Sequence, residues 1–173
     1  MFTISIAGSE DIQQLEALIN SAYRGDASKK GWTTEADILE GEIRTDSFYL
    51  EKQMGNQDAC FLKCSNDEGV IAGTVYLEKI NNRLYLGMLA VSPNQQDSGI
   101  GKQLLLAAED RAKKLACRSI YMTVISIREE LIAWYIRHGY LDSGKRIPFK
   151  GEDRYGKPKI PLQFMELEKK IEN

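Results

Sequence analysis

Long hydrophobic runs are missing from this chain, and none approaches the ~20 residues that a membrane-spanning helix needs. The opening segment Met1–Ser5 lacks the basic and apolar regions of a secretory signal peptide. Cysteine is scarce: Cys60, Cys64 and Cys117 form an odd set, and no second cysteine or histidine pair completes a zinc site. We therefore interpret the cysteines as reduced thiols, and we expect a cytoplasmic protein with no metal and no membrane partner.

An excess of positive charge is also missing, because 23 Lys and Arg residues against 25 Asp and Glu residues give a formal net charge of −2. Proteins that bind nucleic acid usually present a basic face, so the charge gives no support for a nucleic-acid partner. It would not oppose a cationic small substrate. The composition is 43% hydrophobic and 28% charged, and a length of 173 residues suits one domain over residues 1–173 with a substantial core.

Hydrophobic periodicity predicts a mixed α+β (α/β mixed) chain with helices on both faces of one sheet. The expected strands are Phe2–Ile6, Ala59–Ser65, Val70–Ile80, Arg83–Val91, Ser119–Val124 and two after Tyr140, the clearer at Leu162–Glu168. The expected helices are Asp11–Arg24, Glu35–Arg44, Ile100–Leu115 and Glu129–Arg137, with a turn or two more in Ser47–Gln53. Ser9 is expected to cap the first helix, and Thr33 or Thr34 the second. Short turns make strands two to four antiparallel neighbours, whereas a helical connection makes strands four and five parallel.

A loop with two glycines follows the fourth expected strand. Gly99 and Gly101 open an amphipathic helix there, so unpaired backbone N–H groups and the positive helix end face whatever lies above the strand tip. Glycine also lets the backbone approach a phosphate closely. Glycines that serve only tight packing remain the alternative.

Two common phosphate-binding loops do not match this segment. A Walker loop needs Ser or Thr after its lysine, but Lys102 precedes Gln103. A dinucleotide-binding loop needs a third glycine where this chain has Leu104. What remains is the pattern Gln96-x-x-Gly99-x-Gly101.

A second motif lies on the last expected helix and reads Trp134-Tyr135-Ile136-Arg137-His138-Gly139-Tyr140. Together with Gln96–Gly101, it makes the chain resemble the GNAT superfamily of N-acetyltransferases, whose pyrophosphate motif and closing LYxKxGF motif occur in this order and spacing. The resemblance extends from Phe2 to about Glu168, and its specific part is Leu86–Ser143. It implies an acetyl-CoA-dependent enzyme with a GNAT-like mixed, mostly antiparallel sheet of six to seven strands, strands four and five being parallel.

The resemblance also assigns residues to the cofactor. The pyrophosphate would be held by the Gln96 motif through the backbone amides of Asp97, Ser98, Gly99, Ile100, Gly101 and Lys102. The pantetheine arm would pair with the backbone of Leu89, Ala90 and Val91. Tyr135 would lie near the thioester sulfur and protonate the departing thiolate, since a phenol with a pKa near 10 can protonate a thiolate whose conjugate thiol has a pKa near 8.5 at little cost. The competing interpretation of Tyr135 is an aromatic side chain packed on the sheet.

Two departures from the family pattern concern this chemistry. Many relatives carry Asn early in the last helix, where this chain has Arg128-Glu129-Glu130; Arg128 either contacts the cofactor or starts the helix in solvent. Many relatives also use a Glu on the fourth strand as the base, but Arg83–Val91 contains no carboxylate. An attacking amine with a pKa near 10.4 would then lose its proton to water or to an acid elsewhere.

The acceptor side would be formed by the segment after the first helix. There, Trp32 and Glu35 could receive a cationic amine by cation–π and charge contacts, with Glu35 as an anchor or a base. The same residues also suit a helix cap with a packed Trp. Tyr23 and Arg24 are explained by a helix-end role, and His138 by a surface position in a last helical turn.

The leading hypothesis is an N-acetyltransferase that moves acetyl from acetyl-CoA to a primary amine of a small molecule or peptide by direct attack. The alternative is a non-catalytic acyl-CoA-binding or sensing module, supported only by the missing base. Arg146 and Phe149 could line the opposite wall of the acceptor site or lie on the loop surface. The acceptor is not named by the sequence, and a homodimer stays open because relatives often pair through edge strands or C-terminal segments.

Overall fold

The computed structural model describes residues 1–172 and contains a seven-stranded sheet in the order β1-β3-β4-β5-β6-β9-β7. Its strands are β1 (Thr3–Ile6), β3 (Ala59–Ser65), β4 (Ile71–Ile80), β5 (Arg83–Val91), β6 (Ser119–Ile125), β7 (Leu141–Pro148) and β9 (Gln163–Lys170). A two-stranded sheet pairs β2 (Leu39–Glu40) with β8 (Lys157–Pro158). β5 and β6 are parallel and the other neighbours antiparallel. β5 and β6 correspond to the predicted fourth and fifth strands, so the predicted mixed, mostly antiparallel sheet with these two strands parallel is confirmed.

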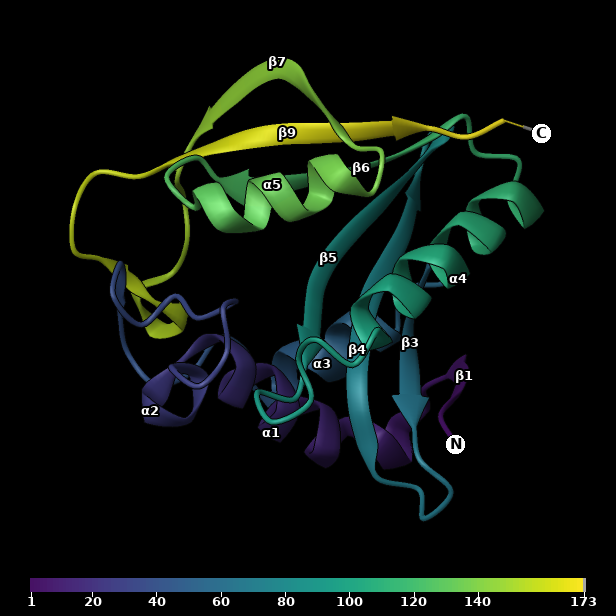
Figure 1. Cartoon of the computed structure of the whole chain (residues 1–173), viewed down its shortest axis with the longest axis horizontal. Helices are drawn as coiled ribbons and strands as arrows, with labels where there is room; N and C mark the ends of the chain where they lie inside the picture. The colour runs from purple at the N-terminus through teal and green to yellow at the C-terminus, as the bar shows by residue number, and fades with distance from the viewer. Residues whose placement is uncertain (173) are drawn as a thin grey trace.

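Helices cover both faces of this sheet (Figure 1). The α-helices are α1 (Ile12–Tyr23), α2 (Gly25–Ser28), α3 (Ser47–Met54), α4 (Ile100–Lys114) and α5 (Glu129–Arg137), with 3₁₀ turns η1 (Ser9–Asp11) and η2 (Asp153–Tyr155). The apolar stripe of α1 packs with Leu50 of α3 in one buried cluster. The stripes of α4 and α5 pack in a second cluster on the opposite face. Each helix therefore buries the face that its 3.6-residue periodicity predicts.

β5, like β3 and β4, contributes side chains to both clusters. Met88 and Ala90 belong to the α1 cluster, whereas Leu89 and Val91 belong to the α4 cluster. Met88 has a φ of +48°, and the β4–β5 register shifts between Thr74 and Tyr76, which is the signature of a bulge.

The two halves of the sheet diverge beyond this central strand. The parallel pairing with β6 extends only from Arg83 to Tyr85, and further along the two strands separate (Figure 1). One edge of β5 beyond Tyr85 therefore has no strand beside it within residues 1–172. The bulge and the divergence place an opening at the end of β5 from which the glycine loop leaves.

Close packing of α4 on β4 depends on a glycine. A Cβ placed on Gly73 would lie 2.6 Å from Ile100 Cγ2 and 3.1 Å from Leu104 Cδ1. We expect Gly73→Ala to lower the free energy of unfolding by about 1–3 kcal/mol, the usual cost of overpacking a core. The denaturant midpoint measures this loss. The control is Gly55→Ala, where the new Cβ would meet neighbours at an ordinary 3.5 Å; equal midpoints for the two variants would contradict the expectation.

The segment between α1 and α3 differs from its prediction. Glu35–Arg44 was expected to be a helix, but the structure has turns and the short strand β2 there. Gly41 lies inside the expected helix with a φ of +114°, which a right-handed helix excludes. The loop expected at Gly25–Gly31 begins instead with the turn α2. Those predicted boundaries are wrong because tertiary contacts, described below, fix this segment.

The start of α1 also differs from its prediction. Ser9 was expected to be the cap, but it lies within η1. The Asp11 carboxylate instead accepts a hydrogen bond from the Gly8 N–H at 2.9 Å. Asp11 is the residue that precedes α1, and its carboxylate closes the turn η1 rather than capping α1.

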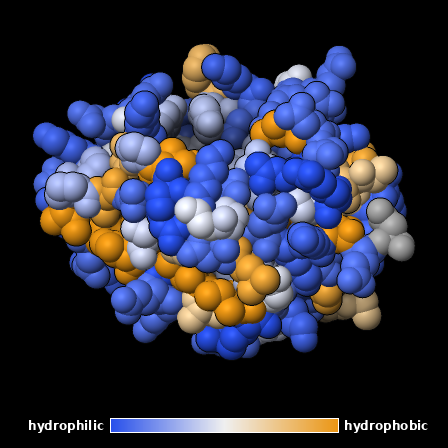
Figure 2. Space-filling model, turned by 90° about the horizontal axis from the view of Figure 1, so that it is seen from above, coloured by the Kyte–Doolittle hydropathy of each residue, from blue (hydrophilic) through white to orange (hydrophobic). Residues whose placement is uncertain are grey.

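The face of the molecule that carries β7 is mostly polar (Figure 2). The side of the molecule that carries β7 is covered largely by hydrophilic residues, with hydrophobic residues in small groups between them (Figure 2). The side chains of β7 are exposed over most of its length, in agreement with its edge position. Among the helices of residues 1–172, none is both long and apolar enough to cross a membrane.

Candidate functional site

The glycine loop turns sharply before α4. Asp97 and Gly99 both have positive φ values, +76° and +86°. The first backbone hydrogen bond of α4 is donated by the Gln103 N–H to the Gly99 carbonyl at 3.0 Å, so the N–H groups of Ile100, Gly101 and Lys102 precede the helical ladder. Because these amides and the helix dipole point the same way, the loop can bind an anion.

One of the six amides predicted for the pyrophosphate is already engaged. The Ser98 N–H donates to the Gln95 carbonyl at 3.3 Å. Ser98 therefore shapes the turn, and the other predicted amides are the better candidates for phosphate contact. No atom lies within 4 Å of the Cβ position of Gly99, so the space above this residue is open.

The Gln96 side chain fastens the loop to its surroundings. Its Oε1 accepts from the Trp32 N–H at 2.9 Å, and its Nε2 donates to Thr33 Oγ1 at 2.9 Å and to the Val91 carbonyl at 3.1 Å. Because its amide bonds to three partners, Gln96 holds the glycine loop in place.

A cavity of about 230 Å³ lies at the glycine loop, between α4 and α5. Its lining joins the glycine loop to the end of β5, to α5 and to the segment after α1: Trp32, Thr33, Leu89, Val91, Gln95, Gln96, Asp97, Gly99, Ile100, Gly101, Lys102, Leu131, Trp134 and Tyr135. We call it the first cleft. It brings together the predicted cofactor residues, apart from Ala90, Ser98 and Arg128.

Aromatic rings close one side of the first cleft. The Trp134 ring lies 3.2 Å from the Cβ position of Gly101, so the second glycine leaves room for this ring. The Trp32 ring centroid is 5.5 Å from that of Trp134. Trp32 was predicted as a wall of the acceptor site, but the structure places it in the first cleft.

Tyr135 lies where the first cleft meets a second cavity. Its side chain lines both spaces and is 4% exposed. Burial, and to a lesser extent the nearby Tyr23 and Tyr140, raises the pKa of the Tyr135 phenol well above its usual value. Among residues 1–172, no side-chain hydrogen bond contributes to this rise in the pKa of Tyr135. The phenol is therefore a protonated donor.

The second cavity measures about 110 Å³ and occupies the opening between β5 and β6. Its charged lining residues are Glu35, Arg44 and Arg128. A third pocket of about 280 Å³ adjoins it and shares Glu35, Arg44, Ile125 and Phe164 with it. We call these two spaces the acceptor side of Tyr135.

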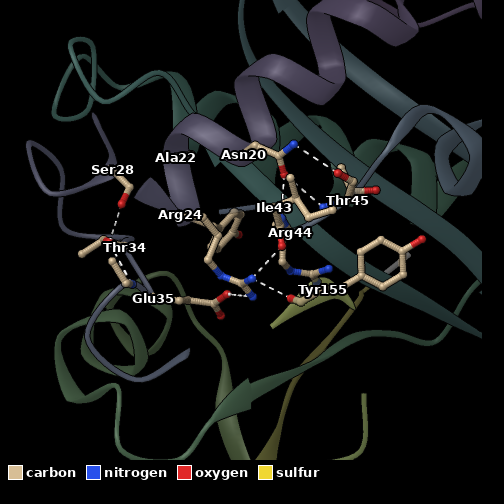
Figure 3. A network of polar contacts seen from close by, with 12 residues as sticks. Asn20, Ala22, Arg24, Ser28, Thr34, Glu35, Ile43, Arg44, Thr45 and Tyr155 are labelled. Atoms are coloured by element: carbon tan, nitrogen blue, oxygen red, sulfur yellow. Dashed lines mark hydrogen bonds and ion pairs between the residues drawn. The ribbon is translucent and has the colours of Figure 1, made fainter. Parts of the chain in front are cut away.

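Glu35 is held between two arginines, Arg24, which Figure 3 shows beside it, and Arg128. Arg24 Nη2 is 3.0 Å from Glu35 Oε1, and Arg128 Nη1 is 3.5 Å from Oε2. The Glu35 and Arg24 side chains are only 8% and 2% exposed. With a cation against each oxygen, this carboxylate is compensated on both sides. That contact set favours a supporting role for Glu35, and its predicted role as anchor or base stays a prediction.

Arg24 is a central residue of this network, although its sequence position suggested only a helix end. It also donates to the carbonyls of Ile43 at 2.8 Å and Tyr155 at 2.5 Å. Burial lowers the pKa of its guanidinium, and the contact with Glu35 opposes that shift. No local pattern could have revealed this role, because the partners lie 11, 19 and 131 residues away.

Arg128 is not among the residues that line the first cleft, and its predicted contact with the cofactor stays a prediction. It donates to the carbonyls of Thr33 and Thr34 as well as pairing with Glu35. Its side chain is only 10% exposed, so it is not a solvated helix start. It ties the start of α5 to the segment after α1, and both lie beside the second cavity.

Tyr23 adds a contact that sequence reasoning missed. Its hydroxyl donates to the carbonyl of Leu89, one of the residues predicted to pair with pantetheine. Burial raises the pKa of Tyr23 to about 12. α1 thus fixes the end of β5 beside Tyr135.

The other side chains considered from sequence lie outside the first cleft and the second cavity. His138 Nδ1 contacts the Trp134 carbonyl at 2.7 Å, and Arg146 pairs with Asp142 at 2.7 Å. Phe149 lines the third pocket. Within residues 1–172, no group of three or more His, Cys, Asp or Glu side chains is placed to hold a metal ion.

Comparison with known proteins supplies the remaining observations. The family model described as "Acetyltransferase (GNAT) family" matches residues 13–140. No curated protein sequence matches the chain.

Several solved structures have a similar fold. The ribosomal-protein-S18-alanine N-acetyltransferase from Escherichia coli is 15% identical, covering 100% of this chain and 96% of that one with a TM-score of 0.72. An N-acetyltransferase from Staphylococcus aureus Mu50 is 14% identical, covering 99% of both chains with a TM-score of 0.73. PaiA N-acetyltransferase from Thermoplasma acidophilum, solved with coenzyme A, is 19% identical, covering 98% and 99% with a TM-score of 0.70. At these identities the likeness establishes the shared fold.

Proposed function

This chain belongs to the acetyltransferase (GNAT) family, and from that premise we propose that it acetylates a primary amine of a small molecule or peptide by direct attack, with Tyr135 as the acid. Membership makes the chain an acyltransferase that uses acetyl-CoA. The family resemblance inferred from two motifs is thereby confirmed, and the acceptor and the role of Tyr135 are the proposal.

The observation that carries the proposal is the position of Tyr135. Its side chain is shared by the first cleft and the second cavity, so a thioester in one and an amine in the other would meet beside it. Among residues 1–172, no side-chain hydrogen bond is a cause of its raised pKa, which supports a hydroxyl that can donate to a bound group. A phenol that serves only to pack a helix on a sheet would not need to border two adjoining spaces.

The residues of the first cleft fit acetyl-CoA as donor. The amides of Ile100, Gly101 and Lys102 would hold the pyrophosphate at the helix end, and the open space above Gly99 leaves room for it. The edge of β5 at Leu89–Val91, which has no strand beside it, would receive the pantetheine arm. The Leu89 and Val91 carbonyls already accept from Tyr23 and Gln96, so the arm would pair with the remaining backbone groups. The bound donor supplies a thioester that an amine can attack.

The protein's own part is to place groups and to give a proton. Tyr135 donates its hydroxyl proton to the sulfur as the carbon–sulfur bond breaks, and the amine nitrogen forms the new amide bond. Burial disfavours every anion in this space, so it raises the pKa of the leaving thiol in the same direction as that of the phenol. The amine loses its own proton to water, because Glu35, the carboxylate that lines the second cavity, is compensated by Arg24 and Arg128.

Release of CoA from acetyl-CoA in a panel of amines tests this function. The panel contains amino acids, amino-acid amides, polyamines and peptides with free N-termini, and thermal shift with acetyl-CoA reports binding separately. We expect binding, and CoA release with at least one class. Binding without release from any amine would instead favour the acyl-CoA-binding module, and absence of binding at millimolar acetyl-CoA would rule out the proposal.

The pH profile gives a second test of Tyr135. A raised pKa means that the phenol keeps its proton up to a higher pH than a free tyrosine, so acid function is lost only above that raised pKa. We expect kcat/KM to rise with pH as the acceptor amine loses its proton, and to show no decline below about pH 10. Initial rates across pH 6–10 with a stability control measure this; a decline beginning near pH 8 would contradict the assignment.

A further inference from the structure

Positive charge is concentrated around the second cavity and the third pocket. Arg24, Arg44 and Arg128 lie at these spaces, and Glu35 is the buried carboxylate among them. The third pocket is also lined by Lys150 and Glu152, so four cationic side chains stand against two carboxylates and leave an excess of positive charge. The positive charges of Arg44 and Arg128 also contribute to the lowered pKa of Arg24, although burial is the main cause. The whole chain is slightly acidic, but the acceptor side of Tyr135 is locally basic.

Two of these three arginines are already committed to the protein. Arg24 binds Glu35 and two backbone carbonyls, and Arg128 binds Glu35 and the carbonyls of Thr33 and Thr34. The Arg44 guanidinium, in contrast, has no hydrogen bond or ion pair with any residue from 1 to 172. It is a free donor group beside the acceptor cavity.

The position of Arg44 is fixed by its backbone rather than by its side chain. Asn20 Oδ1 accepts hydrogen bonds from the N–H groups of Arg44 at 2.6 Å and Thr45 at 3.0 Å, and Asn20 Nδ2 donates to the Thr45 carbonyl at 3.1 Å (Figure 3). The Arg44 Cζ lies 5.9 Å from the centre of the Tyr23 ring. α1 therefore presents this guanidinium at a defined place where the second cavity and the third pocket meet.

From this arrangement we propose that the acceptor is an amine that also carries a carboxylate, as a free amino acid does, and that Arg44 binds this carboxylate. The proposal rests on the proposed function and narrows its substrate class. A guanidinium fork matches a carboxylate with two parallel hydrogen bonds, which a cationic amine cannot accept.

The geometry divides such a substrate into three parts. The amine lies in the second cavity towards Tyr135, and the carboxylate lies at Arg44. The acceptor's side chain extends into the third pocket, whose lining includes Leu39, Phe149 and Phe164. A polyamine would instead bring several positive charges next to uncompensated arginine. Trp32, which the sequence suggested for a cationic amine, lines the first cleft, and its role in acceptor binding stays a prediction.

The test compares acceptors that differ only in the carboxylate. CoA release from acetyl-CoA is measured with the twenty amino acids, their C-terminal amides, the matching decarboxylated amines and spermidine. We expect kcat/KM for the preferred amino acid to exceed that for its amide by about 30-fold or more. In Arg44→Gln, we expect the amino acid's KM to rise about 100-fold and the preference over the amide to disappear, with the KM for acetyl-CoA unchanged.

Matched variants separate this role from a general effect of charge. Arg118→Gln removes an exposed arginine just before β6 and should leave all constants unchanged. Arg44→Lys keeps the charge without the fork and should recover part of the loss. Because the Arg44 side chain holds no protein partner, Arg44→Gln should melt at the temperature of the parent chain; if it does not, Arg44→Lys carries the comparison.

A binding measurement keeps this inference distinct from the proposed function. Calorimetry with CoA-saturated protein reports binding of the preferred amino acid without turnover. Equal use of amides, decarboxylated amines or spermidine, or unchanged constants in Arg44→Gln, would overturn the carboxylate proposal and leave acetyl transfer intact. Arg44-dependent binding of amino acids without CoA release would overturn acetyl transfer and support the carboxylate site. Absence of both binding and release with every amino acid would overturn the carboxylate proposal, and acetyl transfer would fall with it only if no other amine of the panel released CoA.

Discussion

Tyr135→Phe is expected to lower kcat by about two orders of magnitude, within the usual contribution of a positioned general acid. The change removes one oxygen and keeps the buried ring, so the packing of α5 on the sheet is retained. Acetyl-CoA should bind as before, because the amides that begin α4 are untouched. Steady-state kinetics with the preferred amine should show the loss in kcat, with the KM for acetyl-CoA within about twofold of the parent value.

Tyr140→Phe is the matched control for that experiment. The Tyr140 ring packs 5.8 Å from the Tyr135 ring, and its hydroxyl is buried without a partner in the described chain. Removing an unsatisfied buried hydroxyl costs nothing in hydrogen bonding, so rate and stability should stay at or above the parent values. If Tyr135→Phe kept the parent kcat, or if Tyr140→Phe lost as much, Tyr135 would be a packing residue.

The cofactor half of the site could be predicted from sequence because its parts follow one another along the chain. The end of β5, the glycine loop, α4, β6 and α5 form one continuous stretch. Each part has a local signal: Gly99 at a positive φ, an apolar stripe on α4, and Gly139 with a φ of +95° after α5. Each of these signals depends only on residues close in sequence, so the sequence alone was sufficient to predict this part.

The acceptor half could not be predicted in the same way. The acidic first turn of Glu35–Arg44 favours a helix. Gly41 inside that segment opposes one, because glycine in a helix interior costs about 1 kcal/mol. The conformation of this segment is decided by contacts with residues distant in sequence. The Glu35 N–H donates to the Tyr23 carbonyl at 2.7 Å, and β2 pairs with β8 from the far end of the chain.

Charge is the property that sequence described least well. A formal net charge of −2 is an average over the surface, whereas the acceptor side gathers three arginines from α1's end, the Ile43–Thr45 segment and the start of α5. Only the tertiary fold brings Arg24, Arg44 and Arg128 together. The same folding buries Glu35 among them, so its stability role can be tested separately from its chemistry.

Glu35→Gln is expected to lower the free energy of unfolding by about 3–5 kcal/mol, because it leaves the buried Arg24 and Arg128 without their shared counter-charge. For a chain of this length, such a loss corresponds to a fall in melting temperature of roughly 10 °C. The amide is nearly isosteric, so the loss reports charge rather than volume. Differential scanning calorimetry measures it, together with the denaturant midpoint.

The control variants make this last prediction specific to the buried pair of contacts. Glu40→Gln removes an exposed carboxylate five residues away and should change stability by less than about 0.5 kcal/mol. The double variant Glu35→Gln/Arg128→Gln removes one cation along with the anion and should recover part of the loss, since coupled charges are not additive. If Glu35→Gln were as mild as Glu40→Gln, the arginines would be stabilised by their backbone carbonyl contacts alone. Glu35 would then be free to take up the proton of the attacking amine, as the sequence first suggested.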